Sequence, residues 1–266
     1  MKLTTLEGTA NFRDVGGLPL AGGGTTASGV LFRSDALSAL TPRGLEALAG
    51  SGIGVLVDFR TPAERQMAPD RLPPGHPFRT LELPLFEGAF TSRAREEMQR
   101  ANLAGDSEAA ARAVQAGMAQ LPTLGQIYTG MLQTGAPLFA AAARTVAEAD
   151  ESGALLHCTA GKDRTGVATA LLLEAAGTET EAIVADYQLS ERRLAGEWSD
   201  RTLKMITGMG LPLTEEIVTL ATRAPAAAIT SALDWVQENH GGAAGYLRAG
   251  GLLDAELDRL RQRLRG

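Results

Sequence analysis

Four short apolar runs, separated by glycines, prolines and charged residues, are typical of strands buried in a sheet. They cover residues 30–32, 53–59, 80–85 and 154–158. A threonine and a proline follow two of these runs, at Thr41-Pro42 and at Thr61-Pro62, in the order that caps and opens a helix. Strand followed by capped helix predicts an α/β fold with a mainly parallel central sheet flanked by helices.

Helical periodicity dominates the second half of the chain. Residues 166–176 form an apolar helical run directly after the last strand, and residues 191–264 alternate amphipathic stretches with glycine breaks. Near the start, residues 17–20 resemble a further strand, which a turn at Gly22-Gly23-Gly24 joins to the run at 30–32. We therefore expect one domain that spans residues 1–266.

Residues 90–135 interrupt the alternation of strands and helices. The segment begins with charged residues between Arg93 and Arg100, continues through an alanine-rich amphipathic stretch and ends beyond Tyr128. This pattern predicts a helical insertion before the last strand. Two interpretations are open: a lid over the functional site, or an ordinary pair of packing helices.

The composition agrees with a globular protein of 266 residues and 27.8 kDa, in which 44% of the residues are hydrophobic. Because no apolar run reaches the roughly 18 residues of a membrane span and no signal pattern starts the chain, we expect a cytoplasmic protein without stable membrane insertion. Secretion without a signal stays open. The net charge of −6 disfavours a nucleic-acid partner, and a single cysteine excludes an internal disulfide. The pattern predicts no particular oligomeric state.

The only cysteine stands at the end of the last predicted strand, in the segment LLHCTAGKDRTG of residues 155–166. Cys158 is followed six positions later by Arg164 and then by a helix. A helix N-terminus and a guanidinium both favour the thiolate, which is the nucleophilic form of cysteine. The residues between them suffice for a loop whose backbone N–H groups surround a tetrahedral oxyanion. The spacing therefore predicts thiolate attack on a phosphate ester, through a phosphocysteine intermediate.

Cysteine, five residues, arginine and threonine in this order resemble the active-site loop of the cysteine-dependent protein tyrosine phosphatases. Three further segments resemble bacterial tyrosine, dual-specificity and lipid phosphatases of the PtpB-like family; they lie at residues 11–17, at 31–35 and at 57–60 with Glu64. The resemblance extends to residues 245–248. It implies the cysteine-phosphatase fold, an insertion that serves as a lid, and hydrolysis of phosphotyrosine, phosphoserine, phosphothreonine or phosphoinositides without metal or cofactor.

The loop supplies the expected catalytic and binding groups. Cys158 is the expected nucleophile, and Arg164 is expected to hold the transferred phosphoryl group and to stabilise charge on its oxygens. The backbone of Thr159, Ala160 and Gly161 is expected to bind the phosphate of the substrate.

Several neighbours of these groups have two interpretations each. Thr165 either donates a hydrogen bond to the departing thiolate or caps the helix. Lys162 either contacts a second phosphate of the substrate or pairs with a carboxylate such as that of Asp58. Arg60 either binds substrate or serves the architecture. His157 is interpreted as structural, because neighbouring strand residues point to opposite faces.

The leaving group needs a proton, and two aspartates are candidates for the acid. In the resembled family an aspartate inside the loop has this role, which implies Asp163. The alternative is Asp58, at the carboxyl end of a predicted strand, where active-site groups of α/β sheets collect. No aspartate lies between Ser107 and Ala149, the stretch upstream of the loop where other tyrosine phosphatases carry their acid.

Other phosphate-binding functions fit less well. The pair Gly161-Lys162 resembles the phosphate loop of an NTPase, but Leu156 stands where that motif needs glycine and Asp163 where it needs serine or threonine. A non-catalytic module that recognises phosphate is the alternative, and the presence of both Cys158 and Arg164 favours the enzyme. The expected partner is a phosphorylated protein or a phosphoinositide.

Overall fold

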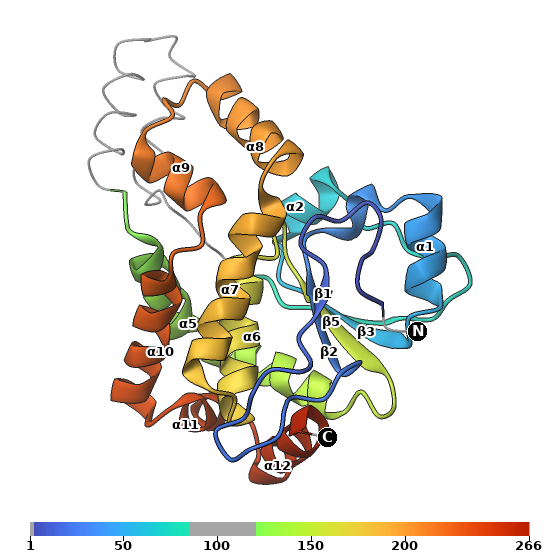
Figure 1. Ribbon diagram of the computed structural model, residues 1–266, viewed down its shortest axis with the longest axis vertical. Coiled ribbons are helices and arrows are strands. Elements are labelled where there is room, and N and C mark those ends of the chain that lie inside the picture. The colour runs from blue at the N-terminus through green and yellow to red at the C-terminus, as the bar shows by residue number, and fades with distance from the viewer. Residues whose placement is uncertain (1–2, 86–120, 266) are drawn as a thin grey trace.

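The computed structural model describes residues 3–85 and 121–265. Within these residues the centre is a five-stranded sheet of strand order β1-β2-β5-β3-β4 (Figure 1). The strands are β1 (Arg13–Asp14), β2 (Leu31–Ser34), β3 (Ile53–Asp58), β4 (Arg79–Glu82) and β5 (Gly153–His157). β1 is antiparallel to β2, and the other neighbouring strands are parallel. The predicted α/β fold with a mainly parallel sheet is confirmed.

Helices cover both faces of this sheet, with α5, α6 and α7 on one side and α1 on the other (Figure 1). They are η1 (Leu37–Ala39), α1 (Pro42–Ala49), α2 (Pro62–Met67), α5 (Leu124–Ala147), α6 (Arg164–Ala175), α7 (Thr180–Leu194), α8 (Glu197–Gly208), α9 (Glu215–Thr222), α10 (Ala226–His240), α11 (Ala243–Ala249) and α12 (Asp254–Arg265). Thr41 and Thr61 cap α1 and α2 as predicted. None of the described helices has both the length and the apolarity that crossing a membrane requires.

The alternation of side chains along β5 decides which face receives the cysteine. Leu156 and Cys158 belong to the larger apolar cluster, with residues of α5 and α6, whereas Leu155 belongs to the smaller cluster on the face of η1 and α1. Since neighbouring strand residues point to opposite faces, His157 shares the face of Leu155. The sequence-based expectation that His157 points away from Cys158 is therefore met.

Helix α6 begins where the cysteine loop ends and lies in the middle of the helical layer. Every residue from Arg164 to Leu173 is buried, so this helix is enclosed nearly all round rather than having one exposed stripe. Its N-terminus is consequently held in a fixed position beside the end of β5.

The structure describes only the last part of the predicted insertion at residues 90–135. Residues 90–120 lie outside the described residues. Residues 124–135 form the first half of α5, which Thr123 and Gln126 open with a capping box and which continues without a break to Ala147. The predicted end at residue 135 is therefore not an element boundary.

The early strand predicted at residues 17–20 is wrong in position. The paired residues are Arg13 and Asp14, opposite Arg33 and Phe32 of β2. Gly17 adopts a φ of 86°, which turns the chain out of the extended conformation. Pro19 and Leu20 form isolated bridges with Thr25 and Thr178, and Leu20 N donates to Gly24 O across the predicted glycine turn.

Candidate active site

The loop of residues 158–164 joins the end of β5 to the start of α6. Gly161, Lys162, Asp163 and Arg164 are buried in it, and only Thr159 is exposed. The N-terminus of α6 faces the loop, and its partial positive charge favours a thiolate or a bound anion there.

Three successive carbonyl groups of the loop face outward and accept hydrogen bonds from the chain segments around β1 and β2. The pairs are Ala36 N to Thr159 O at 3.2 Å, Asn11 Nδ2 to Ala160 O at 2.9 Å and Arg33 Nη2 to Gly161 O at 2.7 Å. Sequence reasoning assigned no role to Asn11 or Arg33, whose partners lie more than a hundred residues along the chain.

The outward carbonyls determine where the loop's N–H groups point. In a planar trans peptide the C=O and the following N–H point in opposite directions, so the N–H groups of Ala160, Gly161 and Lys162 face the interior of the loop. The N–H of Gly161 donates to the Sγ of Cys158 at 3.2 Å. The loop is therefore a nest of N–H groups around the cysteine sulfur, suited to a thiolate and to phosphate oxygens.

Glycine is needed at position 161 for two reasons. Its φ is +64°, in the left-handed region, and a Cβ there would lie 2.2 Å from the carbonyl oxygen of Ser34. Any larger residue would move the loop away from β2.

Arg164 is oriented by Glu64, which lies in the first turn of α2. The two carboxylate oxygens of Glu64 accept from Nη1 and Nη2 of Arg164 at 2.8 and 2.7 Å, and Thr159 Oγ1 donates to Glu64 at 2.6 Å. Burial alone would raise the pKa of Glu64, but the hydrogen bonds from Arg164 and Thr159 outweigh it and hold the pKa well below its usual range. Glu64 thus fixes the guanidinium in a bidentate geometry.

Sequence reasoning placed Glu64 in a motif and in a helix cap but missed this contact. The available signal was the cap itself. Glu64 Oε2 also accepts from the backbone N–H of Thr61 at 2.8 Å, which completes the capping box and holds the carboxylate at the end of β3.

Asp163 is held by two tyrosines from other helices. Its Oδ1 accepts from the hydroxyl of Tyr128 on α5 at 2.6 Å, and that hydroxyl lies 2.6 Å from the hydroxyl of Tyr187 on α7. Lys162 Nζ lies 3.3 Å from the same Oδ1. The sequence marked Tyr128 only as part of a helical segment and Tyr187 not at all, because nothing in the spacing links either residue to the loop.

Lys162 points away from the interior of the loop. Its buried ammonium group donates to the carbonyl oxygens of Leu220 at 2.8 Å and Arg223 at 2.9 Å, at the C-terminal end of α9. Of the two interpretations of Lys162, these contacts favour a lysine that serves the architecture over one that contacts a second phosphate of the substrate. The paired carboxylate is that of Asp163 and not Asp58.

Asp58 and Arg60 belong to a separate buried cluster on the other face of the sheet. Arg60 pairs with Asp58 at 2.8 Å and with Asp70 at 2.6 Å, and both Asp58 and Arg60 are almost fully buried. Burial opposes ionisation of Asp58, but hydrogen bonds from Arg60 and the proximity of His157 hold its pKa below the usual range. These contacts favour the architectural interpretation of Arg60, and they give no support to a contact of Asp58 with substrate.

Among the described residues, Asp58, Asp70 and His157 could in principle hold a metal ion, with ligand atoms within 4.8 Å of one another. Arg60 already supplies the positive charge between the two carboxylates. We therefore assign no metal to this cluster.

Thr165 and a second ion-pair cluster lie directly behind the loop. The hydroxyl of Thr165 is buried and has no hydrogen-bond partner among the described residues.

Asp186 of α7 pairs with Arg13 and Arg33, each at 2.7 Å, and so joins α7 to the strands that hold the loop carbonyls. The pKa of Asp186 is lowered by these arginines despite its burial.

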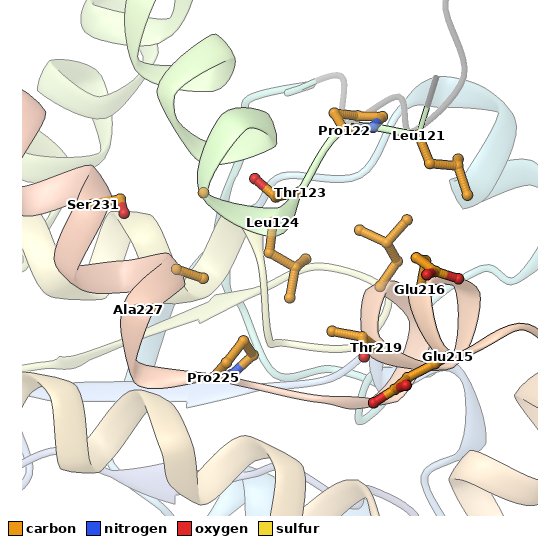
Figure 2. Close-up of a pocket in the computed structure, with 13 residues that line it drawn as sticks. Leu121, Pro122, Thr123, Leu124, Glu215, Glu216, Thr219, Pro225, Ala227 and Ser231 are labelled. Atoms are coloured by element: carbon orange, nitrogen blue, oxygen red, sulfur yellow. The ribbon is translucent and has the colours of Figure 1, made fainter. Parts of the chain in front are cut away.

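An open pocket of about 520 Å³ is lined by residues outside the loop (Figure 2). It is lined mainly by apolar residues at the starts of α5 and α10 and along α9, with Glu215 and Glu216 at its edge. Leu220 also lines it, and the carbonyl of this residue is the one that accepts from Lys162.

Known proteins resemble this chain to different degrees. The model of a family described as the tyrosine phosphatase family matches residues 4–266. A tyrosine-protein phosphatase of Nostoc commune is 30% identical over 235 residues, covering 87% of this chain and 73% of that protein. The triple specificity protein phosphatase PtpB of Mycobacterium tuberculosis is 31% identical over the full length of both chains. A crystal structure of Pseudomonas aeruginosa TpbA aligns with a TM-score of 0.32 at 18% identity, over 60% of this chain and 69% of that one.

Proposed function

Because the chain belongs to the tyrosine phosphatase family, we propose that it hydrolyses phosphate monoesters through a phosphocysteine formed on Cys158. The observation that carries this proposal is the geometry of the loop. The N–H groups of three successive residues face its interior, and one of them donates to the sulfur of Cys158. A phosphate bound by these groups has its phosphorus in front of the sulfur.

In the first step of the proposed reaction, the thiolate of Cys158 forms a bond to phosphorus while the bond from phosphorus to the leaving oxygen breaks. Asp163 gives its proton to that oxygen. Arg164, held by Glu64, stabilises the charge on the other phosphate oxygens, together with the N–H groups of the loop.

In the second step, the carboxylate of Asp163 takes a proton from water, which attacks phosphorus and releases phosphate from Cys158. The buried hydroxyl of Thr165 is one residue beyond Arg164 and is the proposed donor to the departing thiolate. Its lack of another partner among the described residues supports this role.

The proposed substrates are phosphotyrosine and, beyond it, phosphoserine, phosphothreonine and phosphoinositides. The name of the Mycobacterium tuberculosis relative, which includes triple specificity, supports this broad range. Lys162 does not add to it, because its ammonium is engaged by the end of α9.

The test is turnover of para-nitrophenyl phosphate in the presence of EDTA, by the wild type and by the Cys158→Ser variant. We expect hydrolysis by the wild type and a loss of at least about 10³-fold in the variant, because no other nucleophile replaces the thiolate. Rapid quenching with labelled substrate should trap phosphate on the wild-type enzyme only. Phosphopeptide binding without hydrolysis would instead indicate a non-catalytic recognition module.

A further inference from the structure

Three side chains from three helices form a hydrogen-bonded chain that ends on the carboxyl group of Asp163. Tyr187 comes from α7, Tyr128 from α5, and Asp163 stands at the start of α6. Both hydroxyl contacts are 2.6 Å long, and both tyrosines are at most 1% exposed. Three residues far apart in the sequence are thus linked by hydrogen bonds that end at Oδ1 of Asp163.

The number of hydroxyl protons determines which tyrosine donates each of the two hydrogen bonds. A tyrosine hydroxyl has one proton to donate. Tyr128 donates it to Oδ1 of Asp163, so Tyr187 donates to the oxygen of Tyr128. Each hydroxyl that accepts one hydrogen bond and donates another polarises its neighbour, which strengthens the bond to the carboxyl group.

Both tyrosines are permanent donors rather than acids. Burial raises the pKa of Tyr128 well above its usual range, and the nearby Asp163 raises it further. Burial also raises the pKa of Tyr187. Neither hydroxyl therefore loses its proton at the pH values at which a phosphatase works.

The carboxyl group of Asp163 does not have the ordinary role of an aspartate at this position. An aspartate that precedes a helix usually accepts from the N–H groups of the first turn. The side chain of Asp163 makes no such bond to α6 and is directed to the tyrosines instead. Its Oδ1 accepts a hydrogen bond from Tyr128 and lies close to the ammonium group of Lys162. Oδ2 has no partner among the described residues.

We infer that Tyr128 is a positioning residue for the proposed general acid, with Tyr187 behind it. By occupying Oδ1, Tyr128 keeps the transferable proton of Asp163 on Oδ2 and holds that oxygen toward the leaving group. As the S–P bond forms and the P–O bond breaks, the Oδ2 proton passes to the leaving oxygen and Asp163 becomes a carboxylate. The role of Tyr128 rests on the proposed function, in which Asp163 is the acid.

The chain offers matched phenylalanine variants for a test. Tyr128→Phe removes the hydroxyl on Asp163, and Tyr187→Phe removes only the hydroxyl behind it. Tyr246→Phe is the control, because Tyr246 is fully buried and donates to α5 at Leu132 O, 2.8 Å away. All three variants keep the ring and its packing.

The measurement is kcat/KM for an alkyl phosphate, whose leaving group needs a proton, and for para-nitrophenyl phosphate, whose leaving group hardly does. We expect Tyr128→Phe to lose roughly tenfold on the alkyl ester and at most about twofold on the nitrophenyl ester. Tyr187→Phe should lose about threefold on the alkyl ester, and the ratio of the two rates should be unchanged in Tyr246→Phe. Melting temperatures identify any variant that has merely lost its fold.

A double variant separates this inference from the proposed function. If Tyr128 acts through Asp163, adding Tyr128→Phe to Asp163→Asn should change the alkyl rate little further. Equal losses on both esters in Tyr128→Phe, or full additivity in the double variant, would overturn the role of Tyr128. If Asp163→Asn itself shows no selective loss on the alkyl ester, the proposed acid is wrong, independently of the tyrosines.

Discussion

Asp58, at the end of β3, and Asp163, just before α6, are both buried carboxyl groups, yet they are held in different ways. Asp58 has both oxygens paired with the guanidinium of Arg60, which also reaches Asp70. Asp163 has one oxygen held by a neutral phenol and a lysine. Both oxygens of Asp58 are thus engaged by charged partners, whereas Oδ2 of Asp163 has no partner among the described residues and is available to a reacting group. These contacts favour Asp58 as a structural residue and Asp163 as the acid.

The largest effect is expected when Arg60 is removed. Arg60→Met leaves Asp58 and Asp70 without their partner in a buried site, and we expect a loss of about 3–5 kcal/mol in the free energy of unfolding. Denaturant unfolding measures it. The control is Arg248→Met, whose ion pair with Asp254 is equally short at 2.6 Å but exposed, and which should cost less than about 1 kcal/mol. Similar losses in both variants would show that the Arg60 pair is not structural.

The stability of the protein at acid pH should depend on Asp58. Its pKa in the folded protein lies below the ordinary value of 3.8, so its contribution to stability is present above that value and is lost as the pH falls through the folded pKa. Between about pH 4 and the folded pKa, the unfolding free energy of the wild type should fall more steeply than that of Asp58→Asn, by up to about 1.4 kcal/mol per pH unit. Urea titrations across this range measure the slopes, and parallel slopes would contradict the assignment.

The smallest expected effect concerns Lys162, on the Asp163 side of the comparison. Lys162→Met removes the donor to Leu220 and Arg223, and we expect a loss of about 1–2 kcal/mol, because relief from burying an ammonium group offsets part of the lost bonds. Faster amide exchange in α9 should accompany it. Lys204→Met, at an exposed position of α8, is the matched control. If Lys162→Met instead shows a large rise in KM and an unchanged free energy of unfolding, Lys162 contacts the substrate.

The sequence predicted the elements that local pattern determines. The apolar runs that became β2, β3, β4 and β5, and the caps at Thr41 and Thr61, were all predicted to within a few residues. The strand at residues 17–20 was misplaced, because a glycine with positive φ looks no different in the sequence from one in extended chain.

The sequence predicted only those residues of the candidate site that are neighbours along the chain. The segment from Cys158 to Thr165 identified the loop, because a strand, a short spacing and a helix start fix its geometry. Glu64 and Tyr128 contact the loop from two other helices, and Tyr187 contacts Tyr128 from a third. The periodicity of the sequence does not reveal such contacts. The direction of Lys162 was open for the same reason, since its partners at the end of α9 lie 58 and 61 positions away.

The central claim is that Asp163, and not Asp58, protonates the leaving group. The most direct measurement is kcat/KM for an alkyl phosphate relative to para-nitrophenyl phosphate in Asp163→Asn and in Asp58→Asn. We predict that Asp163→Asn lowers this ratio by about 10² or more, whereas Asp58→Asn leaves it within about twofold of the wild type at a temperature where it is folded. A ratio that falls in Asp58→Asn and is unchanged in Asp163→Asn would contradict the claim.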